Sequence, residues 1–475
     1  MPAAPRPAPA ASWRRSAAVA ALVAVAVGSA SSLLARSHLA PAFVAGAIPP
    51  YALYWPLIAV VGALDDLLRN LTPPNLYLWR HLMGYLHTTQ LHTVAQLGLA
   101  DALAGGAKTS LQLAREVTPC GGVADAASPA ACDAVALRLT RLLRATAAYG
   151  VFAEVAPETW AHTPPSRFLV SSPAQPHSLR NSALQFGGTQ YASLIHTTHT
   201  VVTGEASFVK AHGSEFWAYY EAYPDAHAIF DHTMREIGAL GANDEAIAHD
   251  FRWPAIVANG TPVDVGGGLG DMLSHLLLAH PSIARGVVFD LASVTTRSAG
   301  VWRAAAAEPG ARDGPTARRA ALAGRVAFMP GSFFDASTIP TYATLAPAGA
   351  AADACAAPPV VYIMRDIVHD WPDEDVVRML TALGVGMRAP RSGGGCASDR
   401  LTLVARLVAP GASFVGSQGT NDADWLMLAN FGSTAGERTR PHFEALLARS
   451  GLALESVNPL RGWYSVLVAT KLPPA

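Results

Sequence analysis

The chain has 475 residues, of which 51% are hydrophobic and 15% are charged, and its formal net charge is -1 at pH 7. This length favours two or three domains with large apolar cores. The balanced charge, with no long basic run, gives no support to a nucleic-acid-binding protein.

The first 64 residues differ in composition from the rest. They contain no Asp or Glu, and Arg15 precedes an apolar run over residues 17–35. This order is typical of a signal peptide, an uncleaved membrane anchor or an organelle transit sequence. A second apolar stretch, residues 40–63, is a weaker candidate for a membrane span because it contains Pro49, Pro50 and Pro56. We predict a targeting or membrane-anchoring leader over residues 1–64; the alternative is an ordinary N-terminal helix in a cytoplasmic protein.

Residues 65–180 are predicted to form a helical domain. Apolar residues recur near helical spacing over residues 76–103, and a short helix with a Thr or Ser cap is expected from Lys108. An amphipathic helix is expected over residues 135–149.

Two short strands, residues 151–155 and 160–163, follow that helix and complete a winged-helix order. Such a unit can bind DNA, and the helix before the wing carries Arg138, Arg141 and Arg144. Because no wider basic patch extends these arginines, we do not expect nucleic acid as a partner.

The chain has four cysteines, and none forms a C-x-x-C pair that would suggest a zinc site. All four lie in Ala-, Gly- and Ser-rich stretches that are typical of loops: Cys120, Cys132, Cys355 and Cys396. In an oxidising compartment Cys120 and Cys132 could close one loop by a disulfide, whereas free thiols are the alternative.

Residues 181–250 are predicted to be a helical connection with aromatic clusters, and from residue 251 to 475 strands and helices alternate. The expected strands are residues 262–265, 286–290, 325–329, 360–364, 401–406 and 465–470. This order predicts an α/β fold with a doubly wound parallel sheet. Three Ala-rich stretches are predicted to be surface insertions: about 304–324, 341–358 and 389–400.

A glycine-rich turn follows the first of these strands. Residues 266–270 read GGGLG and precede an apolar helix. Glycines let the backbone approach a ligand closely, and the helix N-terminus offers free N–H groups to a carboxylate or a phosphate. Asp290 ends the next strand, where an acid can accept hydrogen bonds from ribose hydroxyls. The dinucleotide fingerprint needs Gly at its sixth position, which here is Asp271, so S-adenosylmethionine is favoured over NAD.

His369 follows the fourth predicted strand, at the sheet edge where doubly wound folds bind ligands. A neutral imidazole can accept a proton near neutral pH, as methyl transfer to a hydroxyl requires. The alternative is a capping or core histidine beside Trp371.

The sequence resembles the caffeate and acetylserotonin (hydroxyindole) O-methyltransferase family, which belongs to the class I S-adenosylmethionine-dependent methyltransferases. The resemblance runs from about residue 66 to the C-terminus. The motifs that carry it are VDVGGGLG at 263–270, VFDL at 288–291, IVHDW at 367–371 and GERT at 436–439, with weaker ones at 96–101 and 230–234.

The resemblance implies a winged-helix-like domain that forms a homodimer, and a Rossmann-like domain that binds S-adenosylmethionine and methylates a hydroxyl of a small, aromatic acceptor. His369 would be the general base and Glu437 the acid that orients it. Phe230 and Met234 would line the substrate pocket. The implied cofactor contacts are Gly266, Gly267 and Gly268 with the methionine part, Asp290 with the ribose, Ser332 and Phe333 with the adenine, Arg365 with the cofactor, and Trp371 near the adenine.

The sequence departs from the family pattern at two places. Ser332 stands where members usually have Asp, and the fifth strand carries Ala405 or Arg406 where many members have an acid beside the base. We therefore expect Glu437 to be the one carboxylate that orients His369, and a nearby Arg to depress the pKa of His369. The same departures keep open a catalytically impaired binding or regulatory protein with this fold.

Overall fold

The computed structural model describes residues 50–118, 120, 129–171, 178–240, 243–307, 314–346, 357–390, 398–408 and 414–473. The residues from Tyr51 onward form one unit. Most of the predicted leader, residues 1–49, lies outside the described residues, as do Cys355 and Cys396.

The first described helix is α3 (Tyr51–Leu71), which contains Pro56. The prolines were expected to weaken this stretch as a membrane span; Pro56 lies inside α3, past its first turn, and the helix continues beyond it. The helix is long and apolar enough to cross a membrane by length and composition, with a mean hydropathy of 1.4 and no buried residue. It also runs through residue 64, where the leader was predicted to end.

The next segment has the predicted helix–helix–wing order. Its helices are α4 (Pro74–Leu82), α5 (Gly84–Leu97), α6 (Leu99–Ala102), α7 (Ser110–Val117) and α8 (Pro129–Ala147), and its strands are β1 (Lys108–Thr109), β2 (Phe152–Ala156) and β3 (Thr159–His162). Thr109 caps α7 through a capping box with Gln112, as the sequence predicted. The three strands pair in the order β1-β3-β2 around the buried Trp160.

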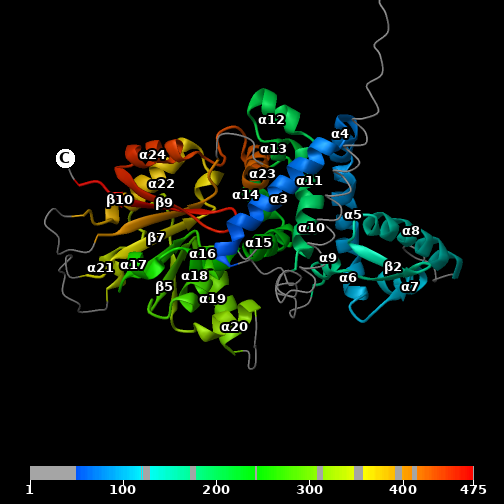
Figure 1. Ribbon diagram of the computed structural model, residues 1–475. Helices are drawn as coiled ribbons and strands as arrows, with labels where there is room; N and C mark the ends of the chain where they lie inside the picture. The colour runs from blue at the N-terminus through cyan, green and yellow to red at the C-terminus, as the bar shows by residue number, and fades with distance from the viewer. Residues whose placement is uncertain are drawn as a thin grey trace, which may run out of the picture. The chain divides into compact units, whose positions relative to one another are not determined.

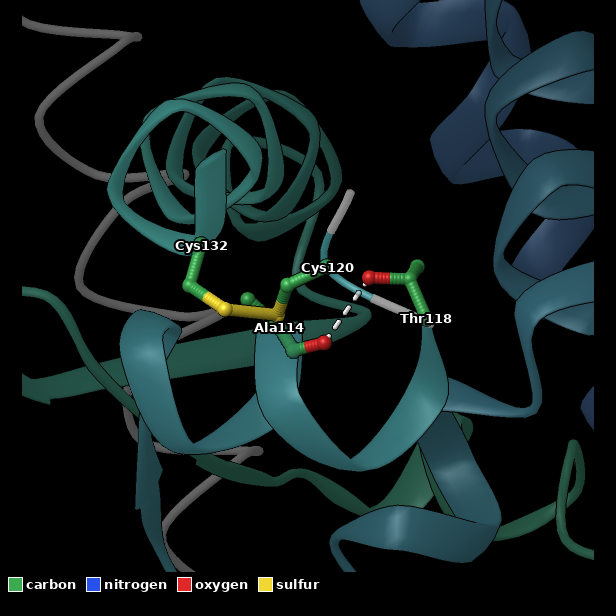
Figure 2. The surroundings of a disulfide bond; sticks show 4 residues. All are labelled: Ala114, Thr118, Cys120 and Cys132. Atoms are coloured by element: carbon green, nitrogen blue, oxygen red, sulfur yellow. Dashed lines mark hydrogen bonds between the residues drawn. A yellow bond between two sulfur atoms is a disulfide. The ribbon is translucent and has the colours of Figure 1, made fainter. Parts of the chain in front are cut away.

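A disulfide joins Cys120 and Cys132. Figure 2 shows Cys132 at the start of α8 and Cys120 beyond the end of α7, close to Ala114 and Thr118. The Thr118 hydroxyl donates to the Ala114 carbonyl (2.8 Å) and closes the last turn of α7. The expectation that Cys132 lies in a loop is therefore wrong, and both cysteines are buried rather than free at the surface.

A series of helices follows the wing and leads to the large sheet. They are α9 (Pro164–Arg167), α10 (Arg180–Gly187), α11 (Thr189–Leu194), α12 (Thr197–Thr203), α13 (Ser207–His212), α14 (Phe216–Ala222), α15 (Pro224–Ala239), α16 (Asn243–Asp250) and α17 (Trp253–Val257). Helices α10 to α16 thus occupy the residues where a helical connection was expected; its division from the neighbouring domains stays a prediction.

The sheet has seven strands in the order β6-β5-β4-β7-β8-β10-β9. The strands are β4 (Thr261–Val265), β5 (Gly286–Asp290), β6 (Val326–Pro330), β7 (Val360–Arg365), β8 (Arg400–Ala405), β9 (Leu452–Pro459) and β10 (Ser465–Lys471). Pairing is parallel from β6 to β8, while β10 is antiparallel to both β8 and β9. The sheet is thus mostly parallel rather than wholly parallel, and β9 was not predicted.

Helices cover both faces of the sheet, which explains why its central strands read as continuous apolar runs. The remaining elements are α18 (Asp271–Ala279), α19 (Ala292–Ala307), α20 (Gly314–Ala321), α21 (Tyr342–Leu345), the 3-10 turn η2 (Val368–Asp370), α22 (Asp373–Gly386), α23 (Phe414–Phe431) and α24 (Arg440–Arg449). Figure 1 shows α22 and α24 on one face and α16, α18 and α19 on the other, and the two apolar cores follow this division.

The Ala-rich stretch near 304–324 is not the surface insertion that the sequence predicted. It contains the end of α19 and all of α20, which contacts α18 and α19. Arg319 in α20 is 4% exposed and pairs with Asp271 at the start of α18 (2.7 Å). A buried ion pair ties this stretch to the cofactor-loop helix. Of the other two stretches, the described parts hold α21 and the start of β8.

We expect the Cys120→Ser/Cys132→Ser variant to unfold at lower denaturant, with a free energy of unfolding lower by about 2–3 kcal/mol, because the disulfide restricts the unfolded chain. The magnitude of this loss of stability follows from the separation of 12 residues between the two cysteines. Equilibrium unfolding followed by circular dichroism measures the change, and oxidised wild type treated with dithiothreitol is the matched control. Equal stability of all three samples would contradict the prediction.

Candidate active site

The turn between β4 and α18 is shaped by its glycines. Gly266, Gly268 and Gly270 have φ of 70°, 54° and 76°, a region that side chains rarely adopt. A Cβ on Gly267 would lie 2.7 Å from Cγ of Asp264. The loop therefore presents bare backbone at the N-terminus of α18, as close binding of a ligand requires.

Asp290 ends β5 beside this loop. Its carboxylate accepts hydrogen bonds from the amides of Gly268 (3.0 Å) and Leu291 (2.7 Å), and burial raises its pKa. A carboxylate oxygen can accept more than one hydrogen bond, so Asp290 is placed to receive ribose hydroxyls while it holds the loop.

Asp264 is a further acid that the sequence analysis did not single out. It lies in β4, is 3% exposed, and its Oδ2 has no hydrogen-bond partner among the described residues. Burial raises its pKa to about 7. An unpaired buried acid next to the glycine loop fits a ligand that brings a cationic or donor group, as the ammonium of S-adenosylmethionine would. The sequence feature that could have identified Asp264 is that it is the single acid in a buried strand.

Aromatic side chains gather after β6 and β7. The rings of Phe333 and Phe334 lie 5.9 and 4.8 Å from that of Trp371. Phe334 was not predicted. Ser332 is engaged in its own turn, because its hydroxyl accepts from the amide of Phe334 (3.2 Å) and its amide donates to Thr338 (3.0 Å).

Arg365 ends β7 and is already paired. Its guanidinium contacts Asp244 of α16 and lies 5.3 Å from the ring centroid of Tyr464. Its predicted contact with the cofactor stays a prediction.

Phe230 and Met234 lie one turn apart on α15. Phe230 packs in an aromatic cluster, 4.8 Å from Tyr220 and 5.6 Å from Phe216 between ring centroids. Met234 is 41% exposed. Neither the packing of Phe230 nor the exposure of Met234 tests their role in a substrate pocket, which stays a prediction.

His369 and Glu437, 68 residues apart in the chain, are in contact. His369 lies in η2, directly after β7, and its Nδ1 is 2.8 Å from Oε1 of Glu437. The amide of Glu437 donates to Asp424 of α23 (2.8 Å), and the amide of Gly436 donates to the His369 carbonyl (2.9 Å). Glu437 is thus fixed by its backbone, and its side chain is only 2% exposed. Nε2 is the imidazole nitrogen that Glu437 leaves free.

A second carboxylate faces His369, contrary to expectation. Oδ1 of Asp370 lies 3.4 Å from Nε2 of His369. Burial alone would lower the pKa of His369, but Asp370 and Glu437 raise it to about 9. Burial raises the pKa of Asp370 to about 7. The prediction that Glu437 is the single supporting carboxylate is therefore wrong.

The arginine expected on the fifth strand is present, but its hydrogen bonds go to carboxylates. Ala405 ends β8, and Arg406 follows it. Its guanidinium contacts Glu437 (3.1 Å) and Asp366 (3.2 Å) rather than the imidazole. Burial lowers the pKa of His369, but the carboxylates of Asp370, Glu437 and Asp366 outweigh it, so the net effect of the surroundings on this pKa is upward.

These features define a class of protein: a Rossmann-like enzyme that binds a nucleoside cofactor at a glycine loop and places a histidine–glutamate pair at the neighbouring strand end. Two family models match the chain: an O-methyltransferase domain over residues 194–453 and an O-methyltransferase dimerisation domain over residues 79–172.

The mitomycin biosynthesis 6-O-methyltransferase of Streptomyces lavendulae is 30% identical over 80% of this chain and 89% of its own. The crystal structure of LaPhzM matches with 26% identity and a TM-score of 0.66, covering 84% of this chain and 100% of that one. CalO1, a methyltransferase of calicheamicin biosynthesis solved with S-adenosylhomocysteine (SAH), matches with 26% identity and a TM-score of 0.59, over 84% and 98%.

The chain belongs to the O-methyltransferase family. It is an S-adenosylmethionine-dependent O-methyltransferase with a dimerisation domain, and it acts as a homodimer. Nothing in these matches supports the alternative of a catalytically impaired binding protein.

The raised pKa of His369 makes stability depend on pH. The folded value of about 9 exceeds the unfolded value near 6.5, so the stabilisation is complete below about pH 6.5 and is lost as the pH rises through 9. Between pH 7 and 9 the wild type should lose about 2 kcal/mol more free energy of unfolding than His369→Gln. Urea unfolding at several pH values measures this, and His199→Gln, at a half-buried histidine paired with the exposed Glu205, is the control. Parallel curves for wild type and His369→Gln would contradict the assignment.

Proposed function

We propose that the enzyme methylates a hydroxyl of a small aromatic acceptor, with Nε2 of His369 as general base and Glu437 as the group that orients it. The observation that carries this proposal is the 2.8 Å contact between Nδ1 of His369 and Glu437 at the carboxyl end of the central strand β7. A donor bond from Nδ1 fixes the tautomer whose Nε2 can accept a proton.

The proposed cofactor contacts follow the same edge of the sheet. Gly266, Gly267 and Gly268 would hold the methionine part and Asp290 the ribose. Ser332, Phe333 and Trp371 would surround the adenine, with Arg365 as a further contact. When bound, S-adenosylmethionine supplies an electrophilic methyl group on its sulfonium.

The protein's part in the reaction is to position the hydroxyl and to take its proton. His369 can accept that proton only when it is neutral, and its pKa of about 9 means that the neutral form is a minority near pH 7. The low exposure of Glu437 and His369, 2% and 12% for the side chains, keeps water from competing for these hydrogen bonds.

The partner subunit is proposed to help close the substrate pocket, and Phe230 and Met234 to line it. The exposed position of Met234 in the single chain is consistent with a surface that a second copy would cover. Membrane association through the leader stays a prediction.

Isothermal titration should show binding of S-adenosylmethionine and SAH but not of NAD. We expect Asp290→Asn to weaken SAH binding by about tenfold or more, because a charged acceptor of the ribose hydroxyls is lost. Asp335→Asn is the matched control, since Asp335 is an exposed carboxylate that bonds Ser337 in its own loop. Failure of a folded, dimeric wild type to bind SAH would overturn the proposed cofactor site.

His369→Ala should lower kcat by about 10²–10⁴-fold without weakening SAH binding, because general-base catalysis is lost while the glycine loop is intact. The wild-type rate should rise between pH 7 and 9, as the base becomes neutral. The assay is methyl transfer to a panel of phenols and hydroxyindoles, and His199→Ala is the control. A His369→Ala enzyme with wild-type kcat would exclude this base.

A further inference from the structure

Arg406 is held in a fixed place at the ends of three strands. It is 7% exposed, and its Nη2 donates to the Tyr464 hydroxyl (2.7 Å). That hydroxyl donates in turn to Oδ2 of Asp366 (2.6 Å), and the guanidinium lies 4.8 Å from the Tyr464 ring centroid. These contacts leave the guanidinium little freedom to turn away.

The same guanidinium reaches the proposed catalytic pair. Nη1 of Arg406 lies 3.1 Å from Oε1 of Glu437, the oxygen that is 2.8 Å from Nδ1 of His369. One buried oxygen is therefore shared by two donors. When His369 is neutral, the positive charge in contact with this carboxylate is that of Arg406, and a buried carboxylate needs such a partner.

Asp366 competes with Glu437 for Arg406. It has φ of 52°, unusual for a residue other than glycine, and its Oδ1 lies 3.2 Å from Nη1 of Arg406. Asp366 thus brings a carboxylate to the place beside β8 where Ala405 carries none.

We propose that Arg406 is a positioning residue of the transfer reaction: shared between Asp366 and Glu437, it fixes the Glu437 carboxylate against His369 and makes release of the proton from the His369–Glu437 pair easier. This inference rests on the proposed role of His369. Removal of the arginine charge should make the pair hold its proton more tightly, and removal of the Asp366 charge should do the opposite.

Several charged or titratable groups face His369 from the surrounding elements, and in each test variant every one of them except the substituted residue has to be unchanged. They are Asp370 in η2, Glu437 and Arg438 before α24, Arg365 and Asp366 at the end of β7, Arg406 after β8, Asp424 in α23 and Tyr464 before β10.

The experiment is a titration of the full chain labelled with ¹³C at histidine Cε1, in the presence of SAH, with the His369 signal assigned by its loss in His369→Gln. We expect Arg406→Gln to move the His369 midpoint up by about one pH unit and Asp366→Asn to move it down. Tyr464→Phe is the matched control, because it removes hydrogen bonds to Arg406 and Asp366 without changing the charge of the cluster. Arg406→Lys keeps the charge and should leave the midpoint near the wild-type value.

A purely structural role for Arg406 predicts lower stability in all of these variants and no opposite shifts, and that result would overturn the proposal. If Arg406→Gln does not fold, Asp366→Asn and Arg406→Lys still decide the sign of the effect. If the His369 midpoint shifts in opposite directions in Arg406→Gln and Asp366→Asn but His369→Ala is active, Arg406 and His369 are coupled and His369 is not the base. No shifts together with an inactive His369→Ala enzyme would reject the role of Arg406 alone.

Discussion

Parallel pairing of β4 with β5 and β7 is the constraint on which the site depends. Val265 is opposite Phe289, and Asp264 is opposite Ile363, so the three strands end at one edge of the sheet. The glycine loop, Asp290 and His369 are each attached to one of these ends. A register shift by one residue would move each strand's side chains to the other face, and both apolar cores oppose that shift.

Burial strengthens the interactions between charged groups at this edge of the sheet and shifts their pKa values. Carboxylates and guanidinium groups that would interact weakly in water lie in contact there with few water molecules to screen them. Arg406 and His369 lower the pKa of Asp366 to about 2, although burial opposes this, while the same surroundings raise that of His369 to about 9. Such divergence between neighbours is typical of functional sites.

The sequence was sufficient for features that depend on local pattern. Six of the seven strands, the glycine loop, a Thr or Ser cap before α7 and the helix–helix–wing order were predicted from the pattern of residue types, and the family motifs paired Glu437 with His369. The rest depends on which distant groups meet. The contact of Arg406 with Glu437 instead of His369 and the burial of Arg319 have no local signal. Strand β9 was missed because its middle alternates weakly, with exposed Glu455 and Ser456.

The cysteine bridge bears on how samples of this enzyme are made. Both of its cysteines lie in the part of the chain matched by the dimerisation model and away from the cofactor loop. Material produced in a reducing cytosol would carry two thiols there, and material produced by secretion would carry the bridge. Preparations with the same cofactor affinity could therefore differ in subunit association, so the oxidation state of Cys120 and Cys132 belongs in the characterisation of each batch.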